Sequence, residues 1–415
     1  MTDIRNMPDN STSDHAIFIG RQPIYDRDGG LYAYELLFRS AHNDKAHVID
    51  GDRATSEVII NTFMEIGLDR IVGDRLAFIN LTRSFFVDET TISLPRDRVV
   101  LELLEDIEVD ETLIAGVRRL AREGYRIALD DFIYHESLQP LVELADVIKI
   151  DIQALDRAQI RQHVEQLRPQ NLQLLAEKVE TREDYDFCHA LGFDYFQGYF
   201  FAEPKIIQGQ RLPNNRLAVL QLLARLQAPD VDADELESLI GRDLAFSYRI
   251  LRYVNSAALA QAREIESIRQ AVVILGLRAI RAWATLLAMS NIDDKPLELV
   301  ITAMIRARMA ENLARATGAP DPDSYFTVGL FSALDALMDN SMEEILTQLP
   351  LASHIARALL AHEGPHGQVL ACVLAYERGK WNALRCDSLD GDRIREAYLD
   401  AVQWTNTIYR NLLDE

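Results

Sequence analysis

The chain has 415 residues, a length that predicts two domains of ordinary size. Apolar residues make up 48% and charged residues 26% of the sequence, the proportions of a folded globular protein, so disorder of the whole chain is excluded. Acidic residues outnumber basic ones by 65 to 43, and the net charge of -22 argues against a general binder of nucleic-acid polymers or anionic membranes. A small phosphorylated ligand in a local site, especially with metal ions, stays compatible with this charge.

The cysteines and the N-terminal residues favour a cytoplasmic protein. The three cysteines, Cys188, Cys372 and Cys386, form no CxxC pair, so we expect neither a disulfide framework nor a zinc-ribbon site. Residues 1–15 are polar and predict a disordered tail without a secretion signal. No uncharged apolar run reaches about 18 residues, the length needed to cross a bilayer, so we expect no membrane span.

Short apolar runs alternate with amphipathic stretches between residues 16 and 206. The runs are Phe18–Tyr25, Leu31–Phe38, Leu76–Leu81, Val99–Leu104, Ile127–Phe132, Val147–Ile152, Leu172–Val179 and Tyr195–Phe201. Strands alternating with helices predict a parallel α/β sheet. Only residues 26–30 separate the first two runs, which is too short for a crossover helix, so these two strands should be antiparallel. The pattern predicts an α/β TIM-like (β/α)8 barrel with an antiparallel first strand, and an open doubly wound sheet is the alternative.

Helical periodicity replaces this alternation after a turn-rich connection at 209–215. Residues 207–415 therefore predict a second domain, an all-α helical bundle. The expected helices are Arg216–Gln227, Ala233–Gly241, Leu244–Asn255, Ile268–Leu275, Leu277–Met289, Pro296–Thr317, Ser324–Met338, Ser341–Gln348, Leu351–Ala361, Gly367–Arg378 and Gly391–Leu412.

Polar residues close almost every predicted strand of the first domain. They are Glu35 and Arg39, Asn80, Glu102 and Glu105, Asp130 and Asp131, Lys149 and Asp151, Glu177 and Glu180, and Gln197. Each alone is typical of a helix cap, a surface salt bridge or an exposed rim lysine. Isolated charges in buried strands are costly, however, and the carboxyl ends of barrel strands meet at one rim. A ring of oxygen ligands around hard divalent cations would explain these residues together.

The segment from about 16 to 205 resembles the EAL-type domain, the (β/α)8 fold that hydrolyses cyclic di-GMP in bacteria. The resemblance is carried by Gln22-Pro23-Ile24, Glu35-Leu36-Leu37-Phe38-Arg39, Asn80, Glu102-Leu103-Leu104-Glu105, Asp130-Asp131-Phe132, Lys149-Ile150-Asp151, Glu177-Lys178-Val179-Glu180 and Gln197-Gly198-Tyr199.

The resemblance implies a two-metal phosphodiesterase site. Its positions for one Mg²⁺ or Mn²⁺ match Glu35, Asn80, Glu102 and Asp130, and those for the second match Asp130, Asp131 and Glu177. Lys149 matches the lysine that contacts the attacking water, so Lys149 and Glu177 are the predicted catalytic residues. The predicted ligand-binding residues are Gln22, Arg39, Asp151 and Gln197, with Glu105 and Glu180 in support. Two metal ions can activate a water and neutralise phosphate oxygens, and a guanidinium such as that of Arg39 can hold a phosphate.

Three positions depart from the family pattern. Leu36 stands where the signature has Ala, and Ile133 and Lys178 stand where the family has Gly. Glycine allows backbone angles that Ile133 disfavours, so the loops that position the ligands look rewritten. Hydrolysis, binding without hydrolysis, and a vestigial site used for protein contacts all stay open.

The second half, from about 207 to 410, resembles the HDOD domain, an all-α relative of HD-type metal phosphohydrolases. The matching pieces lie at 239–247, 251–257, 267–271, 275–277, Trp283 and 329–335. Ser332-Ala333 replaces the His-Asp pair of those enzymes, so HD-type catalysis is not expected. For the histidines, tryptophans and arginines of this half we expect structural roles. The histidines should cap helices or lie at the surface, and the tryptophans should lie in the core or at a domain interface. Solvated, salt-bridging helix faces are expected for Arg278, Arg281, Arg306, Arg308 and Arg315.

The whole chain therefore resembles two-domain EAL–HDOD signalling proteins. The leading hypothesis is cyclic di-GMP binding with divalent metal, with hydrolysis to the linear dinucleotide pGpG, and relay by the HDOD half to an unidentified protein partner. The alternatives are a catalytically inactive scaffold that acts through protein contacts, and a phosphohydrolase for another phosphodiester. A homodimer is a further expectation.

Overall fold

The structure is a computed structural model. It describes residues 17–40, 66–88, 94–104, 107–133, 135, 138–170, 172–198, 214–241, 250–251, 267–290, 292, 296–349, 351–381, 384, 386 and 389–413. These residues form two compact units. One holds the chain up to Gly198 together with 375–384 and 388–396, and the other holds 199–374, 385–387 and 397–415.

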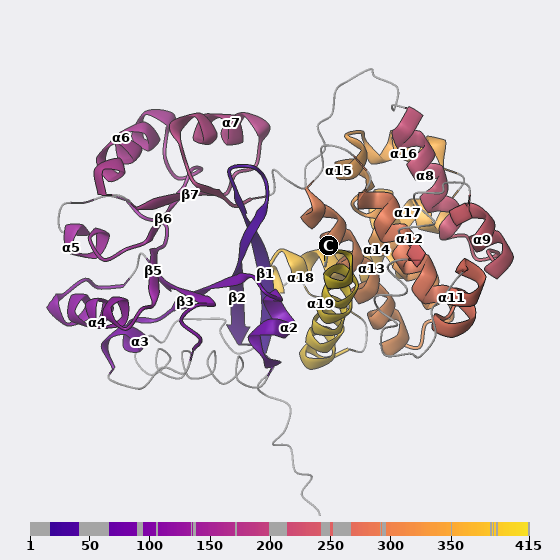
Figure 1. The fold of residues 1–415 in the computed structure, drawn as a ribbon, viewed down its shortest axis with the longest axis horizontal. Helices are drawn as coiled ribbons and strands as arrows, with labels where there is room; N and C mark the ends of the chain where they lie inside the picture. Colours follow the sequence, from indigo (N-terminus) through magenta and orange to yellow (C-terminus); the bar gives the residue numbers. More distant parts are fainter. Residues whose placement is uncertain are drawn as a thin grey trace, which may run out of the picture. The chain divides into compact units, whose positions relative to one another are not determined.

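The first unit is built around a closed barrel of eight strands that follow one another in sequence order (Figure 1). The strands are β1 (Ile17–Asp26), β2 (Leu31–Ser40), β3 (Leu76–Leu81), β4 (Val99–Leu103), β5 (Arg126–Leu129), β6 (Val147–Asp151), β7 (Gln173–Glu177) and β8 (Tyr195–Phe196). Strand β1 runs antiparallel to both of its neighbours, β2 and β8, and the other pairs are parallel. The barrel is therefore mixed, the predicted antiparallel first strand is confirmed, and the open doubly wound sheet is excluded.

The hairpin between β1 and β2 shows why so short a connection suffices. The Asp26 carboxylate accepts hydrogen bonds from the Asp28 and Gly30 amides at 3.0 and 2.7 Å. Gly29 has φ +79°, a conformation that glycine adopts without steric cost. A side chain on Gly30 would force the Asp26 carboxylate to move away from the turn amides.

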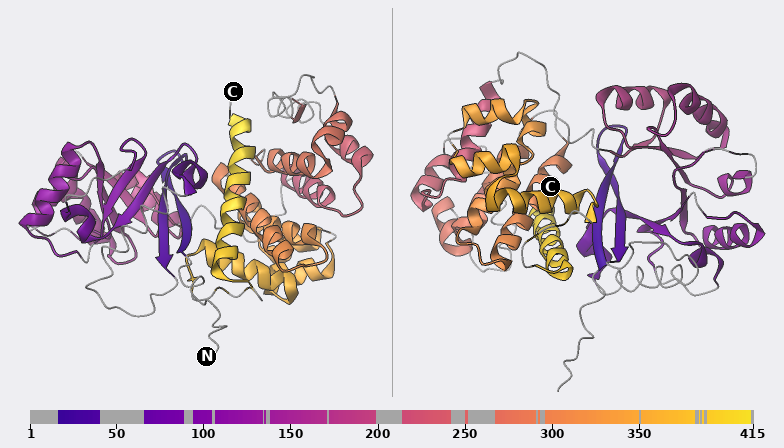
Figure 2. Two further views of the ribbon diagram at one scale, coloured as in Figure 1. Left: turned by 90° about the horizontal axis from the view of Figure 1, so that it is seen from below. Right: turned by 180° about the vertical axis from the view of Figure 1, so that it is seen from behind.

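Short helices connect the parallel strands on the outside of the barrel (Figure 2). They are α2 (Leu68–Val72), α3 (Arg83–Val87), α4 (Glu111–Arg122), α5 (Gln139–Val142), α6 (Arg157–Leu167), the 3₁₀ turn η2 (Arg168–Gln170) and α7 (Arg182–Leu191). Side-chain caps fix where the longer ones begin, because the first backbone N–H groups of a helix have no partner within it. Asp110 caps α4, Asp156 and Gln159 form a capping box on α6, and Thr181 caps α7.

Every element that the structure assigns in the second unit is a helix. These are α8 (Asn214–Leu226), α9 (Ala233–Gly241), α11 (Ile268–Leu275), α12 (Leu277–Ser290), α13 (Leu297–Ala316), α14 (Pro322–Phe331), α15 (Leu334–Met338), α16 (Met342–Gln348), α17 (Ser353–Ala361), α18 (Gly364–Glu377) and α19 (Gly391–Leu413). The last residues of α18, from 375 on, and the first residues of α19, up to 396, belong to the first unit. The expected helix Ser324–Met338 is two helices, α14 and α15, with a break at Ser332 and Ala333. Most of the expected helix Leu244–Asn255 and the predicted tail 1–15 lie outside the described residues.

One stretch from the C-terminal half belongs to the barrel unit, which the sequence did not indicate. The hydroxyl of buried Tyr376 donates to the Ile19 carbonyl at 3.0 Å and accepts from the Ile19 amide at 3.4 Å. The Trp381 ring stacks on Phe18 with ring centroids 5.2 Å apart. Tyr376 and Trp381 therefore pack on β1. No helix among the described residues is long and apolar enough to cross a membrane.

Gly116 tests the packing of α4 on the barrel unit. A methyl group at this buried position would overlap the Phe86 carbonyl at the end of α3. We expect Gly116→Ala to lower the free energy of unfolding by about 1–3 kcal/mol through overpacking. Urea unfolding followed by circular dichroism measures this change. Arg118→Ala on the exposed face of the same helix is the control and should stay within about 0.5 kcal/mol of the wild type. Equal stability of Gly116→Ala and the wild type would contradict the packing.

Candidate functional site

The site rests on one apolar layer inside the barrel. Each strand contributes one buried side chain to this layer: Ile24, Ala33, Phe78, Val100, Ala128, Val147, Leu175 and Tyr195. Side chains two residues apart on a strand point to the same side, so the next inward position on each strand lies one layer further along the barrel axis. Those positions are Gln22, Glu35, Asn80, Glu102, Asp130, Lys149, Glu177 and Gln197. On β1 the step runs backwards in sequence because that strand is antiparallel.

The Lys149 ammonium lies at the centre of this polar layer. The side chain is 0% exposed. Four carboxylates surround its Nζ atom, at 2.6 Å for Asp130, 2.8 Å for Glu102, 2.9 Å for Glu177 and 3.3 Å for Glu35. We call Lys149 and these four residues the lysine cage. A buried charge is tolerated only where it is paired, and here one cation is paired with several acids.

Two amides orient Glu35 within the cage. Asn80 Nδ2 donates to Glu35 Oε1 at 2.7 Å, and Gln197 Nε2 donates to Oε2 at 2.6 Å. Burial raises the pKa of Glu35. The charge of Lys149 and these two hydrogen bonds lower that pKa by more than burial raises it, so the net shift is downward. Glu35 is thus the most firmly ionised acid of the cage.

The pKa values of the other three acids of the cage shift upward. Burial raises the pKa of Glu177 to about 8 and that of Glu102 well above its ordinary value, although Lys149 opposes both shifts. The pKa of Asp130 is raised as well, first by burial and then by the charge of Glu35. Burial lowers the pKa of Lys149, but the four carboxylates raise it more, so the lysine stays charged. The cage therefore holds more carboxyl groups than one ammonium can keep ionised.

A second cluster lies beside the cage at the ends of β5, β6 and β7. The Lys178 ammonium forms an ion pair with Asp151 and lies 3.7 Å from the Asp131 carboxylate. Both Asp131 and Lys178 adopt left-handed backbone conformations, with φ +42° and +56°. Such angles strain residues that carry a side chain, and they occur often at functional sites.

The loop after β5 does not take a glycine-like conformation at Ile133. This residue is not among the described residues with positive φ, and its side chain is 58% exposed. The left-handed conformations lie at Asp131 and Lys178. The bend at Asp131 interrupts the strand alternation that would otherwise send Asp130 and Asp131 to opposite sides.

The remaining predicted site residues differ in their distance from the cage and in whether the structure describes them. Gln22 lies on β1 at the level of the cage and is half-buried. Glu180 is exposed beyond β7. The backbone of Arg39 pairs with Phe18, but its side chain lies outside the described residues, as does Glu105.

The family models agree with the two units. The EAL domain matches residues 16–204 and the HDOD domain matches 212–362. Two relatives align along almost the whole chain. The uncharacterised protein YuxH of Bacillus subtilis is 35% identical over 96% of this chain and 99% of its own, and the cyclic di-GMP phosphodiesterase CdgJ of Vibrio cholerae is 33% identical over 95% and 94%.

The chain belongs to the EAL–HDOD family. Among solved structures, it is similar to a standalone EAL protein from Vibrio cholerae in its c-di-GMP bound form, with 22% identity and a TM-score of 0.37 over 46% of this chain and 92% of that one.

The donor atoms of the EAL barrel fit a hard divalent cation. Buried oxygens without a hydrogen-bond partner are Asn80 Oδ1, Glu102 Oε2, Asp131 Oδ1, Glu177 Oε2 and Gln197 Oε1. Carboxylate and amide oxygens are the ligands that Mg²⁺ and related ions take. Within the described residues no three acids, histidines or cysteines already converge on one metal position, because the cage carboxylates turn toward Lys149 instead. The donor set is therefore present, and metal binding would require these carboxylates to turn away from the ammonium.

Removing the cage cation should destabilise the metal-free barrel. We expect Lys149→Met to lower the free energy of unfolding by about 3–5 kcal/mol, because the substitution leaves several acids buried without their partner. Urea unfolding in buffer with EDTA measures this loss. Lys178→Met is the matched control, and its half-exposed ion pair should cost less than about 1 kcal/mol. Wild-type stability of Lys149→Met would show that the cage does not hold the barrel end together.

Proposed function

We propose that the EAL barrel binds cyclic di-GMP with divalent metal ions and hydrolyses it to the linear dinucleotide pGpG. One observation carries the proposal: the lysine cage gathers four carboxylates around one ammonium, and buried oxygens of the neighbouring Asn80, Asp131 and Gln197 have no hydrogen-bond partner. The relative CdgJ, which is named as a cyclic di-GMP phosphodiesterase, supports the choice of substrate.

The proposed metal ligands are the oxygens that the cage and its neighbour bring to one rim. Glu35, Asn80, Glu102 and Asp130 would hold one ion, and Asp130, Asp131 and Glu177 the other. Bound divalent ions supply a lowered water pKa and neutralise the charge on the phosphate. We propose Mg²⁺ or Mn²⁺ because all these donors are hard oxygens.

The proposed roles of the protein groups follow from their contacts. Asn80 and Gln197 fix the Glu35 carboxylate in one orientation. The Lys149 ammonium would donate a hydrogen bond to the oxygen of the attacking water. As that oxygen bonds to phosphorus, the water would lose one proton to a cage carboxylate, the bond from phosphorus to the ribose 3′-oxygen would break, and the 3′-oxygen would take one proton from solvent. Gln22 and Arg39 would hold the dinucleotide, with Glu105 and Glu180 in support.

Binding without cleavage is the second candidate, and Lys178 favours it. Its ammonium engages Asp151 and lies near Asp131, where it competes with a second cation for the same carboxylate. A nucleotide-independent scaffold is less well supported, because protein contacts alone would not require so many charged side chains in the barrel interior. In each case we propose that the HDOD half relays the state of the barrel to an unidentified protein partner, and that the chain acts in the cytoplasm, with a homodimer still an expectation.

Chromatography of cyclic di-GMP after incubation with the protein and Mn²⁺ or Mg²⁺ tests the proposal. We expect linear pGpG with the wild type and at least about 100-fold less with Glu35→Ala, since displaced metal ligands cost orders of magnitude in rate. Glu165→Ala, which removes an exposed carboxylate on α6 outside the barrel, is the matched control and should retain the wild-type rate. Equal turnover by Glu35→Ala, or cleavage that persists in EDTA, would refute the metal assignment.

Lys178→Gly separates cleavage from binding. Glycine relieves the left-handed strain at this position and frees Asp131 and Asp151 for a second cation. We expect the hydrolysis rate to rise at least about tenfold. Ile133→Gly is the control and should bring no gain, because the Ile133 backbone is not in the left-handed region. An unchanged rate in Lys178→Gly would remove Lys178 as the restraint on the site.

A further inference from the structure

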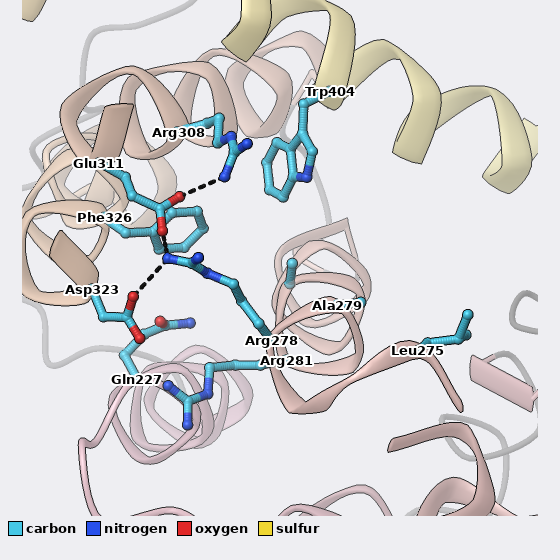
Figure 3. A pocket seen from close by; sticks show the side chains of 11 residues that line it. Gln227, Leu275, Arg278, Ala279, Arg281, Arg308, Glu311, Asp323, Phe326 and Trp404 are labelled. Atoms are coloured by element: carbon cyan, nitrogen blue, oxygen red, sulfur yellow. Dashed lines mark hydrogen bonds and ion pairs between the residues drawn. The ribbon is translucent and has the colours of Figure 1, made fainter. Parts of the chain in front are cut away.

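A cavity of about 220 Å³ lies within the helical unit, lined by residues of α11, α12, α13, α14 and α19 and by Gln227 after α8 (Figure 3). Its walls differ in character. Trp404 and Phe326 meet edge to face with ring centroids 6.1 Å apart, and the Arg308 guanidinium lies over the Trp404 ring at 5.4 Å. Arg278 and Arg281, both from α12, supply a basic wall.

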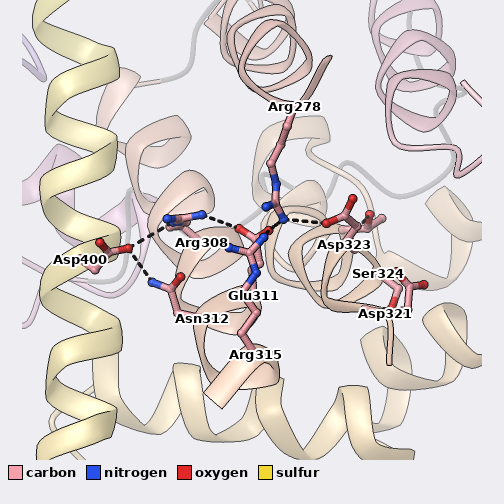
Figure 4. A network of polar contacts seen from close by, with 10 residues as sticks. Arg278, Arg308, Glu311, Asn312, Arg315, Asp321, Asp323, Ser324 and Asp400 are labelled. Carbon is pink, nitrogen blue, oxygen red and sulfur yellow. Dashed lines mark hydrogen bonds and ion pairs between the residues drawn. The ribbon is translucent and has the colours of Figure 1, made fainter. Parts of the chain in front are cut away.

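The buried Glu311 carboxylate organises the basic residues around the cavity (Figure 4). Its side chain is 1% exposed, and it accepts from Arg308 and Arg315 at 2.9 Å each and pairs with Arg278. On its other side Arg308 donates to the Asp400 carboxylate at 3.2 Å, and Asn312 donates to the same carboxylate at 2.9 Å. Glu311 was not among the residues predicted from the sequence, because α13 carries four other charged residues and no local pattern marks this one as buried. Of the five arginines expected on solvated faces, Arg278, Arg281 and Arg308 line the cavity, Arg278, Arg308 and Arg315 pair with Glu311, and Arg306 is buried.

Arg281 lines the same cavity but has no acidic partner in this network. Its Nη2 atom donates to the Val231 carbonyl at 3.3 Å, and its buried Nε has no hydrogen-bond partner. No carboxylate among the described residues forms an ion pair with it within 4.0 Å. Burial lowers the pKa of the Arg281 guanidinium, and neighbouring Arg278 lowers it further while Asp323 opposes the shift. An anion beside Arg281 would relieve both the missing hydrogen bond and the repulsion.

The size of the cavity limits the ligand. A cavity of about 150 Å³ accommodates a benzene ring, so this one can take a single bicyclic base. It is smaller than the roughly 300–1,000 Å³ of sites that enclose drug-sized ligands, and an intact cyclic dinucleotide would not fit. Arg278 and Asp323 are exposed, so a charged group could remain at the mouth while a ring enters.

We propose that this cavity is a second ligand site, which binds a small anion that carries one aromatic ring system, of the nucleoside monophosphate class. The phosphate would lie against Arg281 and Arg278, since a planar guanidinium recognises phosphate oxygens through paired hydrogen bonds. The ring would pack on Trp404 and Phe326. This site is independent of the barrel and does not require its metal ions.

Calorimetric titration of the full chain with AMP and GMP in buffer with EDTA tests the proposal, because EDTA removes the divalent ions that the barrel site would need. The comparison ligands are adenosine, guanosine and inorganic phosphate. We expect at least one monophosphate to bind more tightly than both its nucleoside and inorganic phosphate. Arg281→Gln should weaken that binding by at least about tenfold, and Trp404→Leu should remove the preference for the monophosphate over inorganic phosphate.

Arg269→Gln is the matched control, because Arg269 is an exposed arginine of the same unit that pairs with Asp234 and Glu237 away from the cavity. Its affinity should equal that of the wild type. The proposal is overturned if no monophosphate binds with a Kd below about 1 mM, if inorganic phosphate alone binds as tightly, or if both cavity variants bind as the wild type does. Trp404→Leu keeps the test decisive if Arg281→Gln does not fold.

Discussion

The arrangement of the barrel end depends on the pairing of one buried ammonium with four acids. Lys149 is the cation that makes it tolerable for Glu35, Glu102, Asp130 and Glu177 to lie in the barrel interior. Burial raises the pKa values of three of these acids, and the single ammonium does not offset that rise. Divalent cations would favour the ionised carboxylates, so the acids that are costly in the metal-free barrel are also its candidate metal ligands.

The barrel reaches this arrangement through the alternation of its strands. An apolar layer that includes Phe78 and Leu175 supports a polar layer two residues further along each strand. The second cluster escapes this rule, because Asp131 and Lys178 have left-handed backbones. The regular part of the site therefore follows from strand geometry, and the irregular part follows from two strained residues that also bring a competing ammonium to Asp151.

Much of this could be predicted from the sequence, for identifiable reasons. The apolar runs mark the strands, so the closed barrel could be predicted from the sequence. The five-residue connection at 26–30 is too short for a crossover helix, so the antiparallel direction of the first strand could be predicted as well. The convergence of Glu35 and Glu177 followed once the strands were assigned. The left-handed backbone angles at Asp131 and Lys178 could not be predicted, because φ depends on how the loops close. The packing of Tyr376 on β1 and the gathering of arginines by Glu311 depend on contacts between residues far apart in sequence, which no local pattern encodes.

The central claim is that the oxygens of the lysine cage leave Lys149 to bind divalent metal when the dinucleotide is present. Anomalous diffraction from a crystal grown with Mn²⁺ and cyclic di-GMP tests this claim most directly. The account predicts manganese peaks in contact with Glu35, Glu102 and Asp130, with the Lys149 ammonium turned toward a water or the phosphate. Dinucleotide bound at the barrel without a manganese peak, and with all four carboxylates still on Lys149, would contradict it.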